Sequence, residues 1–164
     1  MAYSPSIVAN YFLDKASREG RAVTPMQLLK LVYIAHGWHL GYLDAPLINE
    51  TVQAWKYGPV IKSLYDKIKH YGSGAVREPV QTGAFPWMRE SAVDETTGSL
   101  LDHVWMNYAG YSGVQLSNMT HQNETPWSIA WHQQGGHRQY FAEIDDDLIK
   151  QHYKAKIARE RAHA

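Results

Sequence analysis

The stretch TPMQLLKLVYIAHGWHLGYL, residues 24–43, predicts a helix at the centre of a bundle. Its only formal charge is Lys30, and apolar residues occupy nearly every face. A helix without a polar face is typical of one that other elements surround. Gly37 and Gly41 are four residues apart, so they share one face and would let another helix approach closely. Each glycine costs about 1 kcal/mol relative to alanine.

Capping patterns predict where several helices begin. A hydroxyl residue before a proline supplies an N-cap, and the missing N–H of the proline costs nothing at the first helical position. This pattern occurs at Ser4-Pro5, Thr24-Pro25 and Thr125-Pro126, and Gly58-Pro59 is a weaker version of it. The spacing of a capping box, in which two side chains satisfy each other's backbone donors, occurs at Thr24 with Gln27 and at Ser112 with Gln115.

The periodicity of apolar residues assigns the remaining elements. It predicts a first helix from Ser4 to near Gly20, helices over residues 58–72, 99–112, 113–121 and 126–134, and a charged C-terminal helix after residues 145–147. Alternating β-formers predict a strand at residues 51–55, and residues 139–144 are expected to pair with it. Residues 72–98 show no period and predict an irregular loop. The expected fold is mainly α: a compact single-domain helical bundle over residues 1–164 with a minor two-stranded β-hairpin.

The composition excludes several classes of function. A chain of 164 residues suits one domain with a single core. Sixteen basic residues balance sixteen acidic ones, so no overall field attracts nucleic acid or an anionic membrane. The chain has no cysteine, which excludes disulfides and thiolate chemistry and fits a reducing compartment. Neither a membrane span nor a signal peptide is evident, so we expect a cytoplasmic protein that binds neither nucleic acid nor membrane.

The nine histidines do not have the spacing of a metal site. His36 and His39 share a face of the central helix, but the H-E-x-x-H pattern is absent and no nearby carboxylate completes a ligand set. His121, His132 and His137 are no better spaced. We therefore expect neither a metal nor another cofactor.

The run LSNMTHQNETPW, residues 116–127, concentrates polar side chains before a Pro-Trp pair. On a helix, Ser117 and His121 are neighbours, and Thr120 can donate to the carbonyl of Leu116. His121 would then cap the end of that helix, just before the next one begins. A catalytic set would need a nucleophile activated by a base, and no G-x-S-x-G elbow is present. The favoured interpretation is a polar joint between two helices.

The irregular loop contains the apolar segment AFPWM, residues 84–88. If Phe85, Trp87 and Met88 are exposed, they form an anchor of the kind that carries binding energy. If they pack back onto the core, they are structural. The sequence leaves both interpretations open.

Four blocks occur in order between about Thr24 and about Trp131: LLKLVYIAHGWHL, QAWKYGPVIKSLY, LLDHVWMNY and LSNMTHQNETPWSIAW. Together they resemble the Panacea domain, the SocA-like antitoxin family that is often found near prophages and toxin genes. The resemblance implies a compact helical protein without enzymatic activity, which binds and neutralises a protein toxin encoded beside it. The namesake of the family is an adaptor that delivers its toxin to ClpXP, a AAA+ protease, and other members neutralise their toxins by direct contact. The resemblance therefore implies one of these two modes.

The resemblance also suggests which residues meet the partner. The expected partner-binding residues in these blocks are Trp55, Tyr57, Pro59, Ser117, Thr120, His121 and Trp127. Trp87 of the irregular loop is expected as a further anchor. Two alternatives are weighed against an antitoxin. One is a phage-associated scaffold or self-associating protein without a toxin, and the other is a hydrolase that uses His121 as a general base with Ser117 or Thr120. The sequence does not predict the oligomeric state.

Overall fold

The central stretch forms one long helix in the computed structural model, which describes residues 2–163. This helix, α2, spans Pro25–Leu43, and Thr24 caps it through the predicted capping box. The Gln27 N–H donates to Thr24 Oγ1 at 3.3 Å, and the Thr24 N–H donates to Gln27 Oε1 at 3.0 Å. The box therefore satisfies two backbone donors that the first turn would otherwise leave free.

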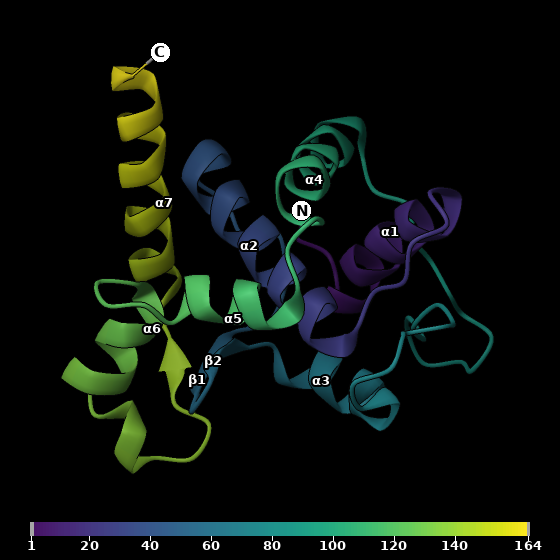
Figure 1. Ribbon diagram of the computed structural model, residues 1–164, viewed down its shortest axis with the longest axis horizontal. Coiled ribbons are helices and arrows are strands. Elements are labelled where there is room, and N and C mark those ends of the chain that lie inside the picture. The colour runs from purple at the N-terminus through teal and green to yellow at the C-terminus, as the bar shows by residue number, and fades with distance from the viewer. Residues whose placement is uncertain (1, 164) are drawn as a thin grey trace.

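The other helices surround α2. Their bounds are α1 Pro5–Arg18, α3 Lys62–Ile68, α4 Glu95–Tyr108, α5 Gly113–Thr120, α6 Pro126–Ser128 and α7 Asp146–Ala162. Shorter turns are the 3₁₀ turns η1 Lys69–Tyr71 and η3 Gly136–Arg138 and the π-helical turn η2 Ile129–Gln133. In Figure 1, α2 lies between α7 on one side and α4 and α1 on the other, and it packs against all three and against α5. The prediction of a buried central helix is confirmed.

The two glycines of α2 bring α7 close, as their spacing predicted. A Cβ atom at Gly37 would lie 2.1 Å from Cε2 of Tyr153, and one at Gly41 would lie 3.0 Å from Cδ1 of Ile157. Tyr153 is almost fully buried and meets the ring of Trp38 edge to face, with 5.0 Å between ring centroids. The bare backbone of α2 is therefore what lets an aromatic ring from α7 enter the core.

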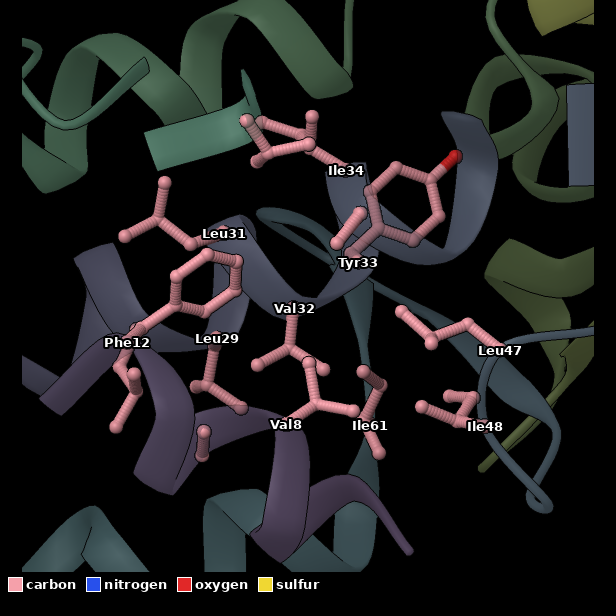
Figure 2. Packing of buried hydrophobic residues seen from close by; sticks show 14 of the residues in the cluster. Val8, Phe12, Leu29, Leu31, Val32, Tyr33, Ile34, Leu47, Ile48 and Ile61 are labelled. Carbon is pink, nitrogen blue, oxygen red and sulfur yellow. The ribbon is translucent and has the colours of Figure 1, made fainter. Parts of the chain in front are cut away.

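The core gathers aliphatic and aromatic side chains from several elements. Figure 2 shows Val8 and Phe12 of α1 packed against side chains of α2 such as Val32, with Leu47 and Ile61 closing the cluster. These side chains are all fully buried. One continuous core of this kind is what makes the chain a compact single domain.

The sheet has three antiparallel strands in the order β2-β1-β3: β1 Val52–Trp55, β2 Gly58–Val60 and β3 Glu143–Ile144. The predicted pairing of residues 51–55 with residues 139–144 is present as β1 with β3. The fold class is confirmed as mainly helical with a small sheet, and this sheet is one strand larger than expected.

The additional strand corrects the interpretation of Gly58-Pro59 as a helix start. Trp55 pairs with Gly58, so the chain reverses through the two residues between them and returns as β2. Gly58 has a φ of 124°, which glycine tolerates and other residues rarely adopt. Helix α3 begins later, at Lys62, after an Ile61 N-cap that makes no side-chain hydrogen bond.

The segment between η1 and α4 lacks regular structure but is anchored at its base. Asn10 is buried on α1, and its Nδ2 donates to the carbonyls of Val80 at 2.8 Å and Glu90 at 2.9 Å. Its Oδ1 accepts from the Val80 N–H at 2.6 Å. α4 begins at Glu95 rather than after residue 98, because Asp94 caps it by accepting from the Thr97 N–H at 2.7 Å.

Candidate functional site

The β1–β2 hairpin is held to the helices through three alternate backbone carbonyls. Nε1 of Trp127 on α6 donates to the carbonyl of Trp55 at 2.5 Å. Oγ of Ser117 on α5 donates to the carbonyl of Tyr57 at 2.8 Å. We call these contacts, together with the one described next, the hairpin clamp.

The third contact of the hairpin clamp comes from Lys30, the charged residue of the central helix. Its Nζ donates to the carbonyl of Pro59 at 2.8 Å, and its side chain is 4% exposed. Burial lowers the pKa of Lys30 to about 7, because an apolar environment penalises the ammonium form. A Cβ atom at Gly58 would lie 2.9 Å from this Nζ, so a larger residue there would displace the ammonium group from its place in the clamp.

Thr120 and His121 lie beside the hairpin clamp and bond to their own helix. Thr120 Oγ1 donates to the carbonyls of Leu116 at 3.0 Å and Ser117 at 3.1 Å, which confirms the predicted back-bond. His121 is the C-cap of α5, also as predicted, and its Nδ1 lies within hydrogen-bonding distance of the Ser117 carbonyl. Its ring meets Trp127 edge to face at 5.4 Å between centroids.

This geometry answers the question of joint or active site. The hydroxyls of Ser117 and Thr120 both donate to backbone carbonyls, and the imidazole of His121 bonds to a carbonyl rather than to a hydroxyl. A general base must instead reach the proton of its nucleophile. The run 116–127 is therefore built as a joint that fixes α5, α6 and the hairpin to one another.

A comparison with protein families gives the chain its relatives. The model of the family described as Antitoxin SocA-like, Panacea domain matches residues 28–128. The chain belongs to the SocA-like Panacea family. The curated protein Antitoxin SocA of Caulobacter vibrioides is 27% identical over 152 residues, which cover 90% of this chain and 80% of that protein. No solved structure matches the chain with significance.

The matched segment contains every residue of the hairpin clamp. It runs from α2 to α6 and includes Lys30, the hairpin, Ser117 and Trp127. The sequence blocks that carry the resemblance to the Panacea family are therefore brought together in space, although they are far apart along the chain. Membership of an antitoxin family supports an antitoxin role.

Half of the eight expected partner-binding residues of this Panacea domain are buried, in or beside the hairpin clamp. Pro59, Ser117, Thr120 and Trp127 are buried. Trp55 and His121 are partly buried, the former with its ring edge to face with Tyr65 at 5.0 Å. Tyr57, at the tip of the hairpin, is 67% exposed. The clamp thus holds the hairpin against the helices and leaves the side chain at its tip exposed.

Trp87 lies away from these residues. The irregular segment that contains it lies on the opposite side of the molecule from η2, η3 and β3 (Figure 1). Trp87 is 74% exposed and stacks on Phe85 with 4.8 Å between ring centroids. The structure therefore supports the interpretation in which the segment AFPWM exposes its aromatic side chains, since both Phe85 and Trp87 are exposed.

The histidines of the central helix have structural partners. His36 is fully buried, with Nε2 2.8 Å from Asp146 Oδ1, and His39 Nδ1 lies 2.5 Å from the carbonyl of Ala45. Burial lowers the pKa of His39, although the bond to that carbonyl opposes the shift. Within residues 2–163, no three histidine, aspartate or glutamate side chains come together as metal ligands would.

Four residues were not predicted as site residues: Lys30 of the hairpin clamp, and Trp131, Tyr140 and Phe141, which line a groove beside the hairpin. A lone charge in an otherwise apolar helix was the available signal for Lys30, because a buried charge requires a partner. The aromatic residues gave no such signal, since the expected strand at residues 139–144 accounted for two of them. None of the helices in the described part of the chain has the length and apolarity that crossing a bilayer requires.

Proposed function

We propose that this chain is a cytoplasmic antitoxin that binds and neutralises a protein toxin encoded beside it. The observation that carries the proposal is membership of the SocA-like Panacea family over residues 28–128. The curated relative named Antitoxin SocA supports it over most of the chain. Neutralisation follows from mass action, because a tight complex lowers the concentration of free toxin.

The form of the hairpin supports neutralisation by contact. An exposed aromatic side chain on a rigid support loses little conformational entropy on binding, and such residues dominate many interfaces. Tyr57 is such a residue, because Ser117 holds its carbonyl and the ring points away from the core, 67% exposed. We include Trp55 and Pro59 as the base of this surface, with Ser117, Thr120, His121 and Trp127 as its support. Trp87 offers a second, separate contact.

Co-expression tests the proposal directly. Each small gene adjacent to this one is expressed alone and together with the wild-type chain, and growth and co-purification are measured. The expected result is one neighbour that stops growth alone, is tolerated with this chain and co-purifies with it. If this chain restores growth against no neighbouring gene, or if no such gene product co-purifies with it, the chain is not an antitoxin. An oligomer on a sizing column without such a neighbour would instead support a scaffold.

A tyrosine substitution locates the contact. Tyr57→Ala should weaken the affinity for the co-purified partner about tenfold or more, because truncating an aromatic anchor at the centre of an interface typically costs about 2 kcal/mol or more. Tyr111→Ala is the matched control, since this tyrosine is also exposed, at 42%, but lies at the start of α5. Equal effects of the two substitutions would exclude the hairpin tip as the contact.

The host strain separates the two modes of neutralisation. If the chain acts by contact, it rescues growth equally in hosts with and without the ClpXP protease. If it acts as an adaptor, rescue disappears in the host without the protease and the toxin level rises there. We propose contact as the principal mode, because a rigid aromatic surface is what a blocking complex requires.

A further inference from the structure

A groove lies between the hairpin and the segment that connects η2 to β3. Its volume is about 470 Å³. Its apolar walls are the rings of Trp55 from β1, Trp131 from η2 and Phe141 just before β3. Lys56, Arg138 and Tyr140 line the same groove. The groove combines residues from two parts of the chain that are far apart in sequence.

Two of the four aromatic side chains that line this groove are highly exposed, and the two tryptophans are partly exposed. Tyr140 is 93% exposed and Phe141 is 53% exposed. Their ring centroids are 6.4 Å apart, and that of Trp55 is 6.1 Å from Phe141. Adjacent exposed aromatic rings of this kind are typical of a surface that a partner covers.

The backbone around the groove departs from its preferred conformations at two places. Phe141 has a φ of 57°, a left-handed conformation that bulky residues rarely adopt. Trp131 lies on the π-helical turn η2, and such turns are rare and frequent at functional sites. Both departures place an aromatic ring in a wall of the groove, which associates the strain with this surface.

The charges of the groove have one sign. Its charged lining residues are Lys56 and Arg138, and within the described residues no aspartate or glutamate lines it. Lys62 adds a third cation, because its Nζ lies 5.5 Å from the centre of the Phe141 ring. Asp66 partly offsets this cation by pairing with Lys62 at 2.7 Å. The groove therefore favours a ligand that brings negative charge.

We propose that this groove binds an acidic segment of a protein partner, with an aromatic or aliphatic side chain of that segment between the rings of Trp55, Trp131 and Phe141. Lys56 and Arg138 pair with carboxylates that flank the inserted side chain. Arginine suits this role because its planar fork donates two hydrogen bonds to one carboxylate. The inference rests on the proposed function in taking the partner to be a protein.

A protein segment fits the groove better than a nucleic acid does. Binding to nucleic acid draws its affinity from many cations that each neutralise a phosphate. Two formal cations line this groove, and the chain as a whole has a net charge of zero. The walls, in contrast, offer three rings around one apolar space, which suits the insertion of a single side chain.

Selection from a random twelve-residue peptide library displayed on phage tests the groove without a toxin. The full chain is the bait, and the selected peptides are synthesised with a fluorescent label and titrated by polarisation. We expect selected sequences to be enriched in Asp and Glu around one aromatic or aliphatic residue. Lys56→Glu/Arg138→Glu should weaken their binding at least tenfold. The matched control Arg77→Glu/Arg161→Glu reverses two exposed charges outside the groove and should leave binding unchanged.

The outcomes separate this inference from the proposed function. Neutral or basic selected peptides, or acidic peptides that bind both charge-reversed variants equally, would overturn the groove. If a labelled single-stranded oligonucleotide binds the wild type but not Lys56→Glu/Arg138→Glu, the groove binds nucleic acid and the proposal of a protein segment is wrong. Thermal melts of both variants check that they fold, and Tyr140→Ala, at a position that is almost fully exposed, provides a second variant that should weaken peptide binding. If acidic peptides bind but the chain suppresses the toxicity of no neighbouring gene, the groove is retained and the antitoxin role is rejected.

Discussion

His36 and Asp146 join the central helix to the last one. Nε2 of His36 donates to Oδ1 of Asp146 at 2.8 Å, at the first turn of α7. Its Nδ1 accepts from the N–H groups of Leu47 at 3.3 Å and Ile48 at 3.5 Å, which places the proton on Nε2. One buried imidazole therefore connects α2, α7 and the loop before the sheet.

Asp146→Ala should lower the free energy of unfolding by about 1–3 kcal/mol, because it leaves a buried N–H without an acceptor. Asp147→Ala is the matched control, since its side chain is 75% exposed and one residue away. That control should change stability by less than about 0.5 kcal/mol. Urea denaturation measures both. Equal losses would show that His36 finds another acceptor.

Gly37→Ala should destabilise the fold, although alanine is the better helix former. The new methyl group would meet the buried ring of Tyr153, whose Cε2 would lie 2.1 Å away. Overpacking of this kind costs about 1–3 kcal/mol or more. Gly110→Ala is the control, because nothing lies within 4 Å of a Cβ there. Thermal melts compare the two, and a stabilised Gly37→Ala protein would contradict the packing of α7 on α2.

Lys30 should make the stability depend on pH. Burial lowers its pKa to about 7 in the folded chain, while the unfolded chain keeps a pKa near 10.4. Between these values the unfolded state binds more protons, so the free energy of unfolding rises with pH. Below pH 7 both states are protonated and this contribution no longer changes.

Lys30→Met isolates this effect, because methionine has a similar shape and does not titrate. The stability of the wild type relative to Lys30→Met should rise by roughly 2–3 kcal/mol between pH 6 and pH 9, since each pKa unit corresponds to 1.36 kcal/mol. Urea denaturation at several pH values measures the difference, in which the other titrating groups cancel. A difference that does not vary with pH would mean that Lys30 keeps its charge while buried.

His121→Ala distinguishes the joint from a catalytic site. The substitution removes the bond to the Ser117 carbonyl and the edge contact with Trp127. We expect a loss of about 1–2 kcal/mol in stability and growth rescue that persists at low temperature. His103→Ala, at an exposed position of α4, should leave both unchanged. Unchanged stability with complete loss of function would support the hydrolase instead.

Local patterns predicted the parts of the fold that depend on neighbouring residues. The caps at Ser4, Thr24, Ser112 and Thr125 were all predicted, and each accepts from the N–H three residues on. Such contacts lie within one turn, so the residue types and their spacing suffice. Gly58-Pro59 was misassigned because the same pair suits a helix start and the return strand of a hairpin.

The sequence predicted which polar residues lie near the hairpin but not which groups of the hairpin they bond to. Ser117 and Trp127 were expected at a partner surface, and they lie instead beneath the hairpin, bonded to the carbonyls of Tyr57 and Trp55. The sequence did not indicate that Tyr140 is exposed, because aromatic residues in short strands can be either buried or exposed.

The amino-acid sequence by itself determined the four capped helix starts at residues 4, 24, 112 and 125, the buried central helix, the close approach at Gly37 and Gly41, and the family. Those features depend on residue type, period and spacing over short distances. Only the tertiary structure decided that Lys30, Ser117 and Trp127 meet the same hairpin and that Trp55 and Phe141 share a groove. These contacts join positions up to 86 residues apart. Which distant groups meet is set by the packing of the whole core, and no local pattern contains that information.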